Sequence, residues 1–267
     1  MEFLSSLYLK GLSYSALNTA RSAVSTFSFA SEYENIGSNP LVSRLLKGVF
    51  ERRPPAPRYD ETWDVGIVFG FLKTVEPLSR LCLLDLTKKT ICLMALVSGK
   101  RRNALHQLKV TNMKICDDHV VFTNVKQKQD KPGKPIKPIS FYKYDIDKEL
   151  CVFRCILYYI TVTKDLRTDD GFFIRTKKPH RHATSETLSN WIKDVLHSSG
   201  VDIATYSSHS TRSAAASAAN KTISVDTILN AVGWTCEKTF ARFYNKEIKY
   251  HPVQQMATAV LSTAIKQ

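Results

Sequence analysis

His209-Ser-Thr-Arg212 opens the stretch that decides the fold, and the alanine-rich run 214–219 follows it directly. This pattern predicts a short helix on which His209 and Arg212 lie one turn apart and leave from the same face. The small alanine side chains would let the helix lie close to its neighbours. Further along come Gly233-Trp234 and then Phe243-Tyr244-Asn245. A histidine and an arginine that bind a phosphate, followed by an exposed tyrosine, would suit nucleophilic attack on a phosphodiester, but the spacing alone is weak because it recurs by chance.

The charge balance of the chain indicates a polyanionic partner. The 267 residues include 38 Lys and Arg against 24 Asp and Glu, a net charge of +14. Such an excess favours nucleic acid as the partner. A membrane surface is the competing polyanion, but no basic amphipathic helix stands out. The apolar run 91–97 is too short to cross a bilayer, and the N-terminus shows no secretory signal, so we expect no membrane partner.

The cysteines predict buried thiols in a reducing compartment. The six cysteines are at positions 82, 92, 116, 151, 155 and 236. Most of them lie inside apolar segments, and none forms a C-x-x-C pair. We therefore expect an intracellular protein, in the nucleus if the source is eukaryotic and in the cytoplasm otherwise. Cys151 and Cys155 could bind a metal with His180 and His182, but core packing is the stronger expectation for free cysteines. No cofactor or metal is expected.

The first 52 residues predict a small helical domain, which its basic positions make a candidate DNA-binding unit. Helices are expected over 3–10, 14–31 and 41–50, the second capped by Ser13 and the third by Asn39-Pro40. The proline-rich, basic stretch 52–58 is typical of a stiff connector, so residues 53–63 are expected to form a linker. The basic residues of the third helix and its end could face either DNA phosphates or solvent: Arg44, Lys47, Arg52 and Arg53.

Residues 64–267 predict a second, larger domain that is mainly α with a small antiparallel sheet, an α+β fold. Helices are expected over 64–75, 86–97, 151–162 and 185–198, the second ending at Gly99 and the last capped by Ser185. Strands are expected over 108–115, 119–125 and 136–141, with a hairpin turn at Asp117-Asp118 and a lysine-rich turn at 126–134. A short buried strand at 171–174 and a helical tail at 253–265 complete the prediction.

The ordered set Gly99-Lys-Arg101, a lysine in a β-turn, His209-x-x-Arg212, Gly233-Trp234 and Tyr244 resembles the tyrosine recombinase (phage integrase) superfamily. The resemblance covers about residues 60–250 and implies the catalytic-domain fold of that superfamily. The N-terminal helical segment looks like a shortened core-binding domain.

Finer features are similar to recombinases of eukaryotic mobile elements, the DIRS/Ngaro-like and Crypton-like groups. These features are Gly-x-Arg after an apolar helix, Lys128-x-x-x-Pro-Gly-Lys in the turn, and Phe-Tyr-Asn-Lys after the tryptophan. Two positions depart from many bacterial members. Ala104 stands where an acidic residue is common, and the interval from Trp234 to Tyr244 is one residue longer, which leaves Tyr250 as a second candidate nucleophile.

The resemblance implies a site-specific recombinase or integrase that needs no metal or cofactor. Tyr244 would attack phosphorus and form a 3′-phosphotyrosine, while Arg101 and Arg212 would hold the two non-bridging oxygens. His209 would accept the tyrosine proton or hold an oxygen, and Trp234 would donate one hydrogen bond. Lys128 is the candidate general acid for the leaving oxygen, with Lys126 and Lys131 as alternatives. Assembly on DNA from dimer to tetrameric synapse is implied as well.

Two other functions use the same residues. A type IB topoisomerase would cleave DNA with a similar set but relax supercoils instead of exchanging strands. A DNA-binding protein could also keep the fold and lose cleavage. The sequence leaves both open, because only activity separates them from recombination.

Overall fold

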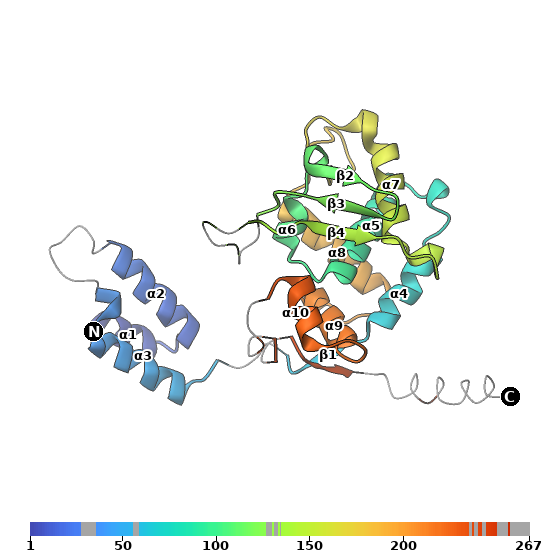
Figure 1. The fold of residues 1–267 in the computed structure, drawn as a ribbon. Coiled ribbons are helices and arrows are strands. Elements are labelled where there is room, and N and C mark those ends of the chain that lie inside the picture. Colours follow the sequence, from blue (N-terminus) through green and yellow to red (C-terminus); the bar gives the residue numbers. More distant parts are fainter. Residues whose placement is uncertain are drawn as a thin grey trace. The chain divides into compact units, whose positions relative to one another are not determined.

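The computed structural model of the chain describes residues 1–27, 36–55, 59–126, 130, 133, 135–234, 237, 240–241, 244–249 and 256. The chain divides into two compact units, Met1–Arg58 and Tyr59–Gln267 (Figure 1). Residues 61–63, which the sequence placed in the linker, form a strand of the second unit. The predicted helical tail at 253–265 lies outside the described residues except for Met256.

The described residues of the N-terminal unit form three α-helices, α1 (Glu2–Leu9), α2 (Tyr14–Phe27) and α3 (Pro40–Arg52), and a short 3₁₀ helix (Ile36–Ser38). The predicted caps are present, because Ser13 Oγ accepts the Ala16 N–H and Asn39 Oδ1 accepts the Leu41 N–H. The core of the unit contains apolar residues from all three helices: Leu4, Leu17, Val42, Leu46 and Val49. Arg53, a candidate phosphate contact, instead donates to the Tyr8 carbonyl at 3.0 Å and covers the Tyr8 ring.

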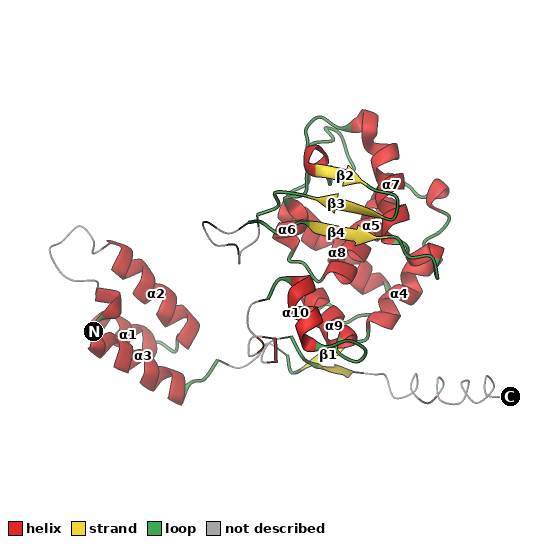
Figure 2. Ribbon diagram, viewed as in Figure 1, coloured by secondary structure: helices red, strands yellow, loops and turns green. Residues whose placement is uncertain are grey.

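Helix α5 (Leu83–Ser98) is the centre of the second unit. It packs against α7 (Val152–Thr163), α8 (Ser185–Ser198) and α9 (Ser210–Ala219), as Figure 2 shows. Its near-continuous apolar sequence is buried from Ile91 to Leu96, as expected for a helix with neighbours on every side. The helix ends at Gly99, which adopts the left-handed conformation with φ 56°. Helix α4 (Val65–Thr74) precedes it and the short α6 (Arg102–His106) follows.

The predicted antiparallel sheet is present, with shorter strands than expected. Strands β2 (Met113–Ile115), β3 (His119–Phe122) and β4 (Ile139–Tyr142) lie in that order, and His119 pairs with Tyr142. Residues 110–112 form a 3₁₀ turn instead of the start of β2. The mainly α class with a small antiparallel sheet is therefore confirmed.

Residues 171–174 are buried, but the prediction of a strand there was wrong. They form only isolated bridges, Lys109 with Gly171 and Ile174 with His182. The Ile174 N–H donates to the Tyr159 hydroxyl at 3.1 Å rather than to a neighbouring strand. Other backbone groups of the run pair with neighbouring segments, since the Phe172 N–H donates to the Leu108 carbonyl and the Phe173 carbonyl accepts the Ala183 N–H, both at 2.8 Å. The run is therefore buried with its backbone satisfied, but without a continuous strand.

In the C-terminal half, several details of the structure differ from the sequence prediction. Thr184, not Ser185, caps α8, since Thr184 Oγ1 accepts the Thr187 N–H at 3.2 Å while Ser185 donates to Asn103. Helix α10 (Val225–Val232) and the parallel pair of β1 (Glu61–Trp63) with β5 (Glu247–Lys249) had not been predicted.

Cys151 and Cys155 lie in the core cluster, which agrees with the expectation of core packing. In the described residues, no group of three or more His, Cys, Asp or Glu side chains is arranged to hold a metal ion. No described helix combines the length and the hydrophobicity that crossing a bilayer requires.

Candidate active site

Arg212 is the most unusual side chain of the second unit, because a guanidinium lies in the protein interior. It is 1% exposed, and its Nη1 donates to the Gly99 carbonyl at 2.7 Å. The contact depends on the close approach of α9 to α5, and the small, buried Ala214 on α9 is compatible with that approach. The bond thereby links the end of α5 to α9 through two residues that are 113 positions apart in the sequence.

The rest of the Arg212 guanidinium is available for a ligand. Nε and Nη2 are buried and make no hydrogen bond of full geometry among the described residues, although the Tyr244 side chain lies within interaction range of the guanidinium. No carboxylate in the described part of the chain forms an ion pair with it. Burial, and next the charge of Arg101, lower the pKa of Arg212 to about 10, whereas the charge of Tyr244 and a side-chain hydrogen bond to it act in the opposite direction. The group is therefore still charged at neutral pH, and a buried charge with free donors calls for an anion.

Trp234 and Tyr244 pack on this guanidinium. The Arg212 Cζ lies 4.4 Å from the centre of the Trp234 ring and 5.3 Å from that of Tyr244. The two rings lie 4.3 Å apart. Cations favour the faces of aromatic rings, and indole is the best of them. The Trp234 Nε1 is buried and has no hydrogen-bond partner among the described residues, so it is a further donor beside Arg212.

Backbone contacts with α9 hold Tyr244 in place. The Ser217 hydroxyl donates to the Tyr244 carbonyl at 2.7 Å and accepts the Lys246 N–H at 2.9 Å. The Tyr244 N–H donates to the Phe240 carbonyl at 2.8 Å. The Tyr244 side chain is half-buried, and its ring lies 6.5 Å from that of His209. No sequence pattern marks Ser217 as a member of the site.

His209 is the residue immediately before the first turn of α9. Its side chain reaches the surface, but the protein around the ring, and next the charges of Arg212, Arg101 and Arg102, lower its pKa. A lowered pKa leaves the imidazole neutral at pH 7, so it can accept a proton. The ring is thus suited to act as a general base near Tyr244.

Arg101 lies close to this group, whereas two candidate lysines and one candidate tyrosine are outside the described residues. Arg101 immediately precedes α6, and its charge lowers the pKa of both Arg212 and His209. Lys126 is exposed after β3. Lys128, Lys131 and Tyr250 belong to the part of the chain that the structure does not describe.

Lys100 is a member of the site that the sequence analysis noted only as part of a basic cluster. It is 7% exposed, and its Nζ donates to the Val232 carbonyl at 3.2 Å. Burial, then Arg212 and Lys137, lower its pKa to about 8, while Asp130 opposes the shift. Asp130 and Lys137 lie between β3 and β4 in the sequence, and both are near enough to Lys100 to act on its pKa. The sequence feature that could have identified Lys100 is a charged residue placed between Gly99, which ends a helix, and Arg101.

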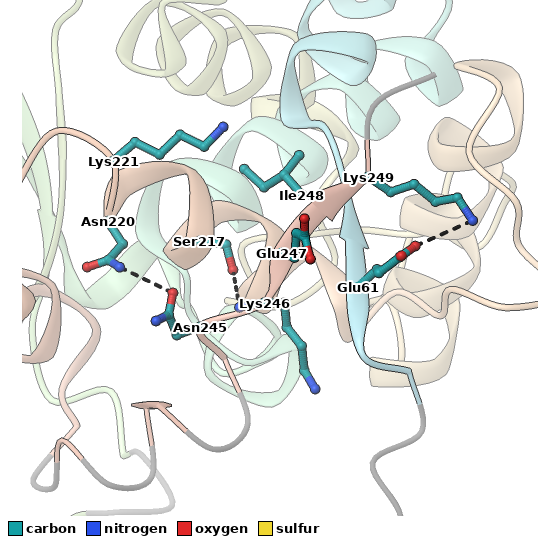
Figure 3. Close-up of a pocket in the computed structure, with 9 residues that line it drawn as sticks. All are labelled: Glu61, Ser217, Asn220, Lys221, Asn245, Lys246, Glu247, Ile248 and Lys249. Atoms are coloured by element: carbon teal, nitrogen blue, oxygen red, sulfur yellow. Dashed lines mark hydrogen bonds and ion pairs between the residues drawn. The ribbon is translucent and has the colours of Figure 1, made fainter. Parts of the chain in front are cut away.

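A polar cavity of about 590 Å³ borders the segment that follows Tyr244 (Figure 3). Ser217 and Lys246 line it, and an ion pair of 3.4 Å between Lys249 and Glu61 closes one edge. His209, Arg212 and Trp234 do not line it. The candidate active site is therefore the group of side chains around Arg212, not this cavity.

Comparison with known proteins shows similarity in structure alone. No protein-family model matches the chain, and no curated protein matches it in sequence.

The following three are among the solved structures that match most of the chain. The XerH site-specific recombinase, solved with its palindromic difH substrate in a post-cleavage complex, has a TM-score of 0.62 and 17% identity over 89% of this chain. The Tn1549 transposon integrase, solved with transposon right end DNA, has a TM-score of 0.60 and 13% sequence identity over 98% of this chain. A lambda integrase dimer bound to a COC′ core site has a TM-score of 0.53 and 16% sequence identity over 94% of this chain.

This chain covers 65% of the XerH chain, 83% of the Tn1549 integrase chain and 79% of the lambda integrase chain. The three similar proteins are all site-specific recombinases or integrases. The order of the helices, the small sheet and the convergence of distant residues on Arg212 together show that this chain has the fold of the tyrosine recombinases.

Proposed function

We propose that the chain is a site-specific DNA recombinase or integrase that cleaves and rejoins DNA through Tyr244. One observation carries the proposal: the buried Arg212 guanidinium has two free nitrogens and is in contact with Trp234 and Tyr244. An interior cation with free donors matches the non-bridging oxygens of a phosphodiester, and the nucleophile lies beside it.

The cations and the indole would bind the scissile phosphate. Arg212 and Arg101 would each hold a non-bridging oxygen, because a guanidinium remains charged and donates two parallel hydrogen bonds. The Trp234 N–H would donate one more. Their combined positive charge would stabilise the additional negative charge that develops on the phosphate as the nucleophile attacks.

Cleavage would proceed with a balanced transfer of protons. His209 accepts the phenolic proton of Tyr244 as the phenolic oxygen bonds to phosphorus. The bond from phosphorus to the 5′ oxygen breaks, and a lysine of the turn after β3 protonates that oxygen. Lys128 is the proposed donor, with Lys126 and Lys131 as alternatives. The 3′-phosphotyrosine conserves the bond energy, so a 5′ hydroxyl of a second strand reverses the reaction without an external energy source.

Double-stranded DNA is the proposed partner, and the proposed assembly is a dimer that pairs into a tetramer. The net charge of +14 supports attraction to DNA. Lambda integrase, similar in structure, has been solved as a dimer on a core site and as a tetramer on a Holliday junction. The proposed origin in a eukaryotic mobile element, with a nuclear location, rests on the sequence resemblance alone.

A trapping experiment tests the proposal. The full chain is incubated with nicked suicide duplexes whose core sequence is randomised, and the products are separated by denaturing electrophoresis. Wild type should yield a covalent protein–DNA band, Tyr244→Phe should yield none, and Tyr142→Phe, which alters an exposed tyrosine on β4, should match wild type. A band that survives in Tyr244→Phe but disappears in Tyr250→Phe would assign the nucleophile to Tyr250.

A second assay separates the alternative functions. A recombinase should exchange strands between paired copies of the sequence selected by trapping. A topoisomerase would relax a supercoiled plasmid without that exchange. Binding to DNA with no covalent band from any variant would indicate a DNA-binding protein without cleavage.

A further inference from the structure

A ring of contacts connects Lys100 to Trp234 and back to Arg212. Gly99 and Lys100 are neighbours in the chain; the Gly99 carbonyl accepts from Arg212, and the Lys100 Nζ donates to the Val232 carbonyl. Val232 is the last residue of α10, and Trp234 follows it by two positions. The Trp234 ring then lies over the Arg212 guanidinium, which closes the ring.

The Val232 carbonyl belongs to the C-terminal turn of α10, where carbonyls lack a partner within the helix and carry partial negative charge. Lys100 supplies that partner. The turn that follows is tight, because Gly233 has φ 81° and the N–H groups of Gly233 and Trp234 both donate to the Leu229 carbonyl. Fixing the Val232 carbonyl therefore fixes the direction in which Trp234 leaves the helix.

A neutral donor would suffice for that hydrogen bond, so the charge of Lys100 needs a separate explanation. Lys100 and Arg212 are both nearly fully buried, and among the described residues neither forms an ion pair. Two interior cations side by side raise the free energy of the empty site. An oxyanion bound at Arg212 would compensate both charges at once.

We propose that Lys100 is a positioning residue of the oxyanion site: it holds the Val232 carbonyl, keeps Trp234 on the Arg212 guanidinium, and adds a second buried positive charge that a bound oxyanion neutralises. This inference rests on the proposed phosphate site at Arg212. The charged groups that act on Lys100 come from two elements, Arg212 on α9 and Asp130 and Lys137 between β3 and β4.

Sulfate is the probe that tests the proposal, because it keeps two negative charges between pH 6.5 and 9.5. The full chain is labelled with ¹⁵N and titrated with sulfate at constant ionic strength. The indole N–H signal of Trp234, assigned with Trp234→Phe, reports both the position of the ring and anion binding. In wild type this signal should shift on binding, and the affinity should fall between pH 7 and pH 9 as Lys100, with a pKa of about 8, loses its proton.

Three substitutions at Lys100 separate its two roles. Lys100→Met should weaken sulfate binding at pH 7 at least tenfold and should move the Trp234 signal even without sulfate. Lys100→Gln keeps a donor without the charge, so the Trp234 signal should stay near its wild-type position while sulfate binds weakly. Lys100→Arg should bind within threefold of wild type, with an affinity that stays constant from pH 7 to pH 9.

Lys88→Met serves as the matched control. It also removes a lysine charge from this region of the chain, but Lys88 on α5 forms an ion pair with Asp194 on α8. It should leave both readouts unchanged, and thermal melting of every variant confirms that it is folded. A wild-type Trp234 signal and wild-type sulfate affinity in Lys100→Met would overturn the inference. Failure of the phosphate site itself looks different: sulfate would then leave the Trp234 signal unmoved in wild type and in Arg212→Lys alike.

Discussion

In the proposed reaction, Arg212 would use different nitrogens for structure and for chemistry. Its Nη1 is committed to the Gly99 carbonyl, while Nε and Nη2 are free among the described residues. Because the guanidinium is planar and rigid, the bond to Gly99 sets the plane in which the other two nitrogens lie. The main-chain contact thus orients the donors before any ligand arrives, which is the preorganisation that stabilises a transition state.

Replacing Arg212 with lysine should separate cleavage from DNA binding. Lysine keeps the charge but cannot bind Gly99 and an oxygen in one plane, so covalent-complex formation should slow by about 100- to 1,000-fold, the range seen when one oxyanion donor is lost. DNA affinity, measured by fluorescence anisotropy, should change by less than about threefold, because many other basic residues supply the salt-dependent attraction. Arg212→Ala should also lose cleavage and keep binding. A parallel collapse of DNA affinity would instead make Arg212 a general DNA contact or a structural residue.

The pH dependence of cleavage should reflect His209. Partial burial and the nearby arginines lower its pKa below the ordinary value of 6.5. The neutral imidazole is the base, so the cleavage rate should be fully developed at pH 7 and should fall only as the pH drops through a value below 6.5. Single-turnover rates between pH 4.5 and 8, with circular dichroism to exclude acid unfolding, measure this. A midpoint at or above 6.5, or an unchanged profile in His209→Gln, would assign the proton transfer to another group.

The sequence predicted the members of the candidate site better than it predicted the residues that support them. Arg101, His209, Arg212, Trp234 and Tyr244 belong to a pattern with a fixed order, and the structure brings them together.

Lys100 and Ser217 have no such pattern. Their partners lie 132 and 27 positions away, at Val232 and Tyr244. Contacts of this kind depend on tertiary packing, which local spacing does not encode.

The end of α5 is the element on which the site is built. Gly99 has φ 56°, and a β-carbon at this position would lie 3.1 Å from the Val232 Cγ2. The same residue presents the carbonyl that holds Arg212. A left-handed glycine is therefore needed for the turn, for the approach of α10 and for the Arg212 contact at once.

Gly99→Ala should destabilise the protein and slow cleavage. The left-handed conformation alone costs an alanine about 1–2 kcal/mol, and Val232 must also move away. Urea unfolding should show a loss of at least that size, and the rate of covalent-complex formation should fall because the Gly99 carbonyl shifts. Gly70→Ala is the matched control: Gly70 lies within α4 with no atom near its missing β-carbon, so it should gain about 0.5–1 kcal/mol. Equal stability of the two variants would contradict the role of Gly99.

Elements with a strong local signal were predictable, and those made by distant segments were not. Helix α5 shows its apolar run and its terminal glycine in the sequence, and α3 shows its Asn39 cap. Strands β1 and β5 are three residues long and pair across 186 positions, Glu61 with Glu247. Neither segment has the length or alternation that marks a strand in the sequence. Each strand is stabilised by the other, and β1 also by the hydrogen bond that Trp63 donates to Ser210 of α9.

At the scale of the molecule, the two units have separate cores and different shares of the charge. The buried clusters of 1–58 and 59–267 share no residue. The first unit has seven Lys and Arg against four Asp and Glu, a net charge of +3, which leaves +11 of the total +14 to the second. The second unit therefore carries the candidate active site and most of the expected attraction to DNA.

The fragment 59–267 should fold alone and keep the chemistry while losing part of its affinity for DNA. Its core is complete without the first unit, so thermal unfolding should remain cooperative. The logarithm of its DNA affinity should fall linearly with the logarithm of salt concentration, with a smaller slope than that of the full chain, because fewer phosphates are contacted. Trapping on suicide duplexes at low salt should still give a covalent band that depends on Tyr244. A fragment that folds and binds DNA but forms no such band would show that residues 1–58 supply something the reaction itself requires.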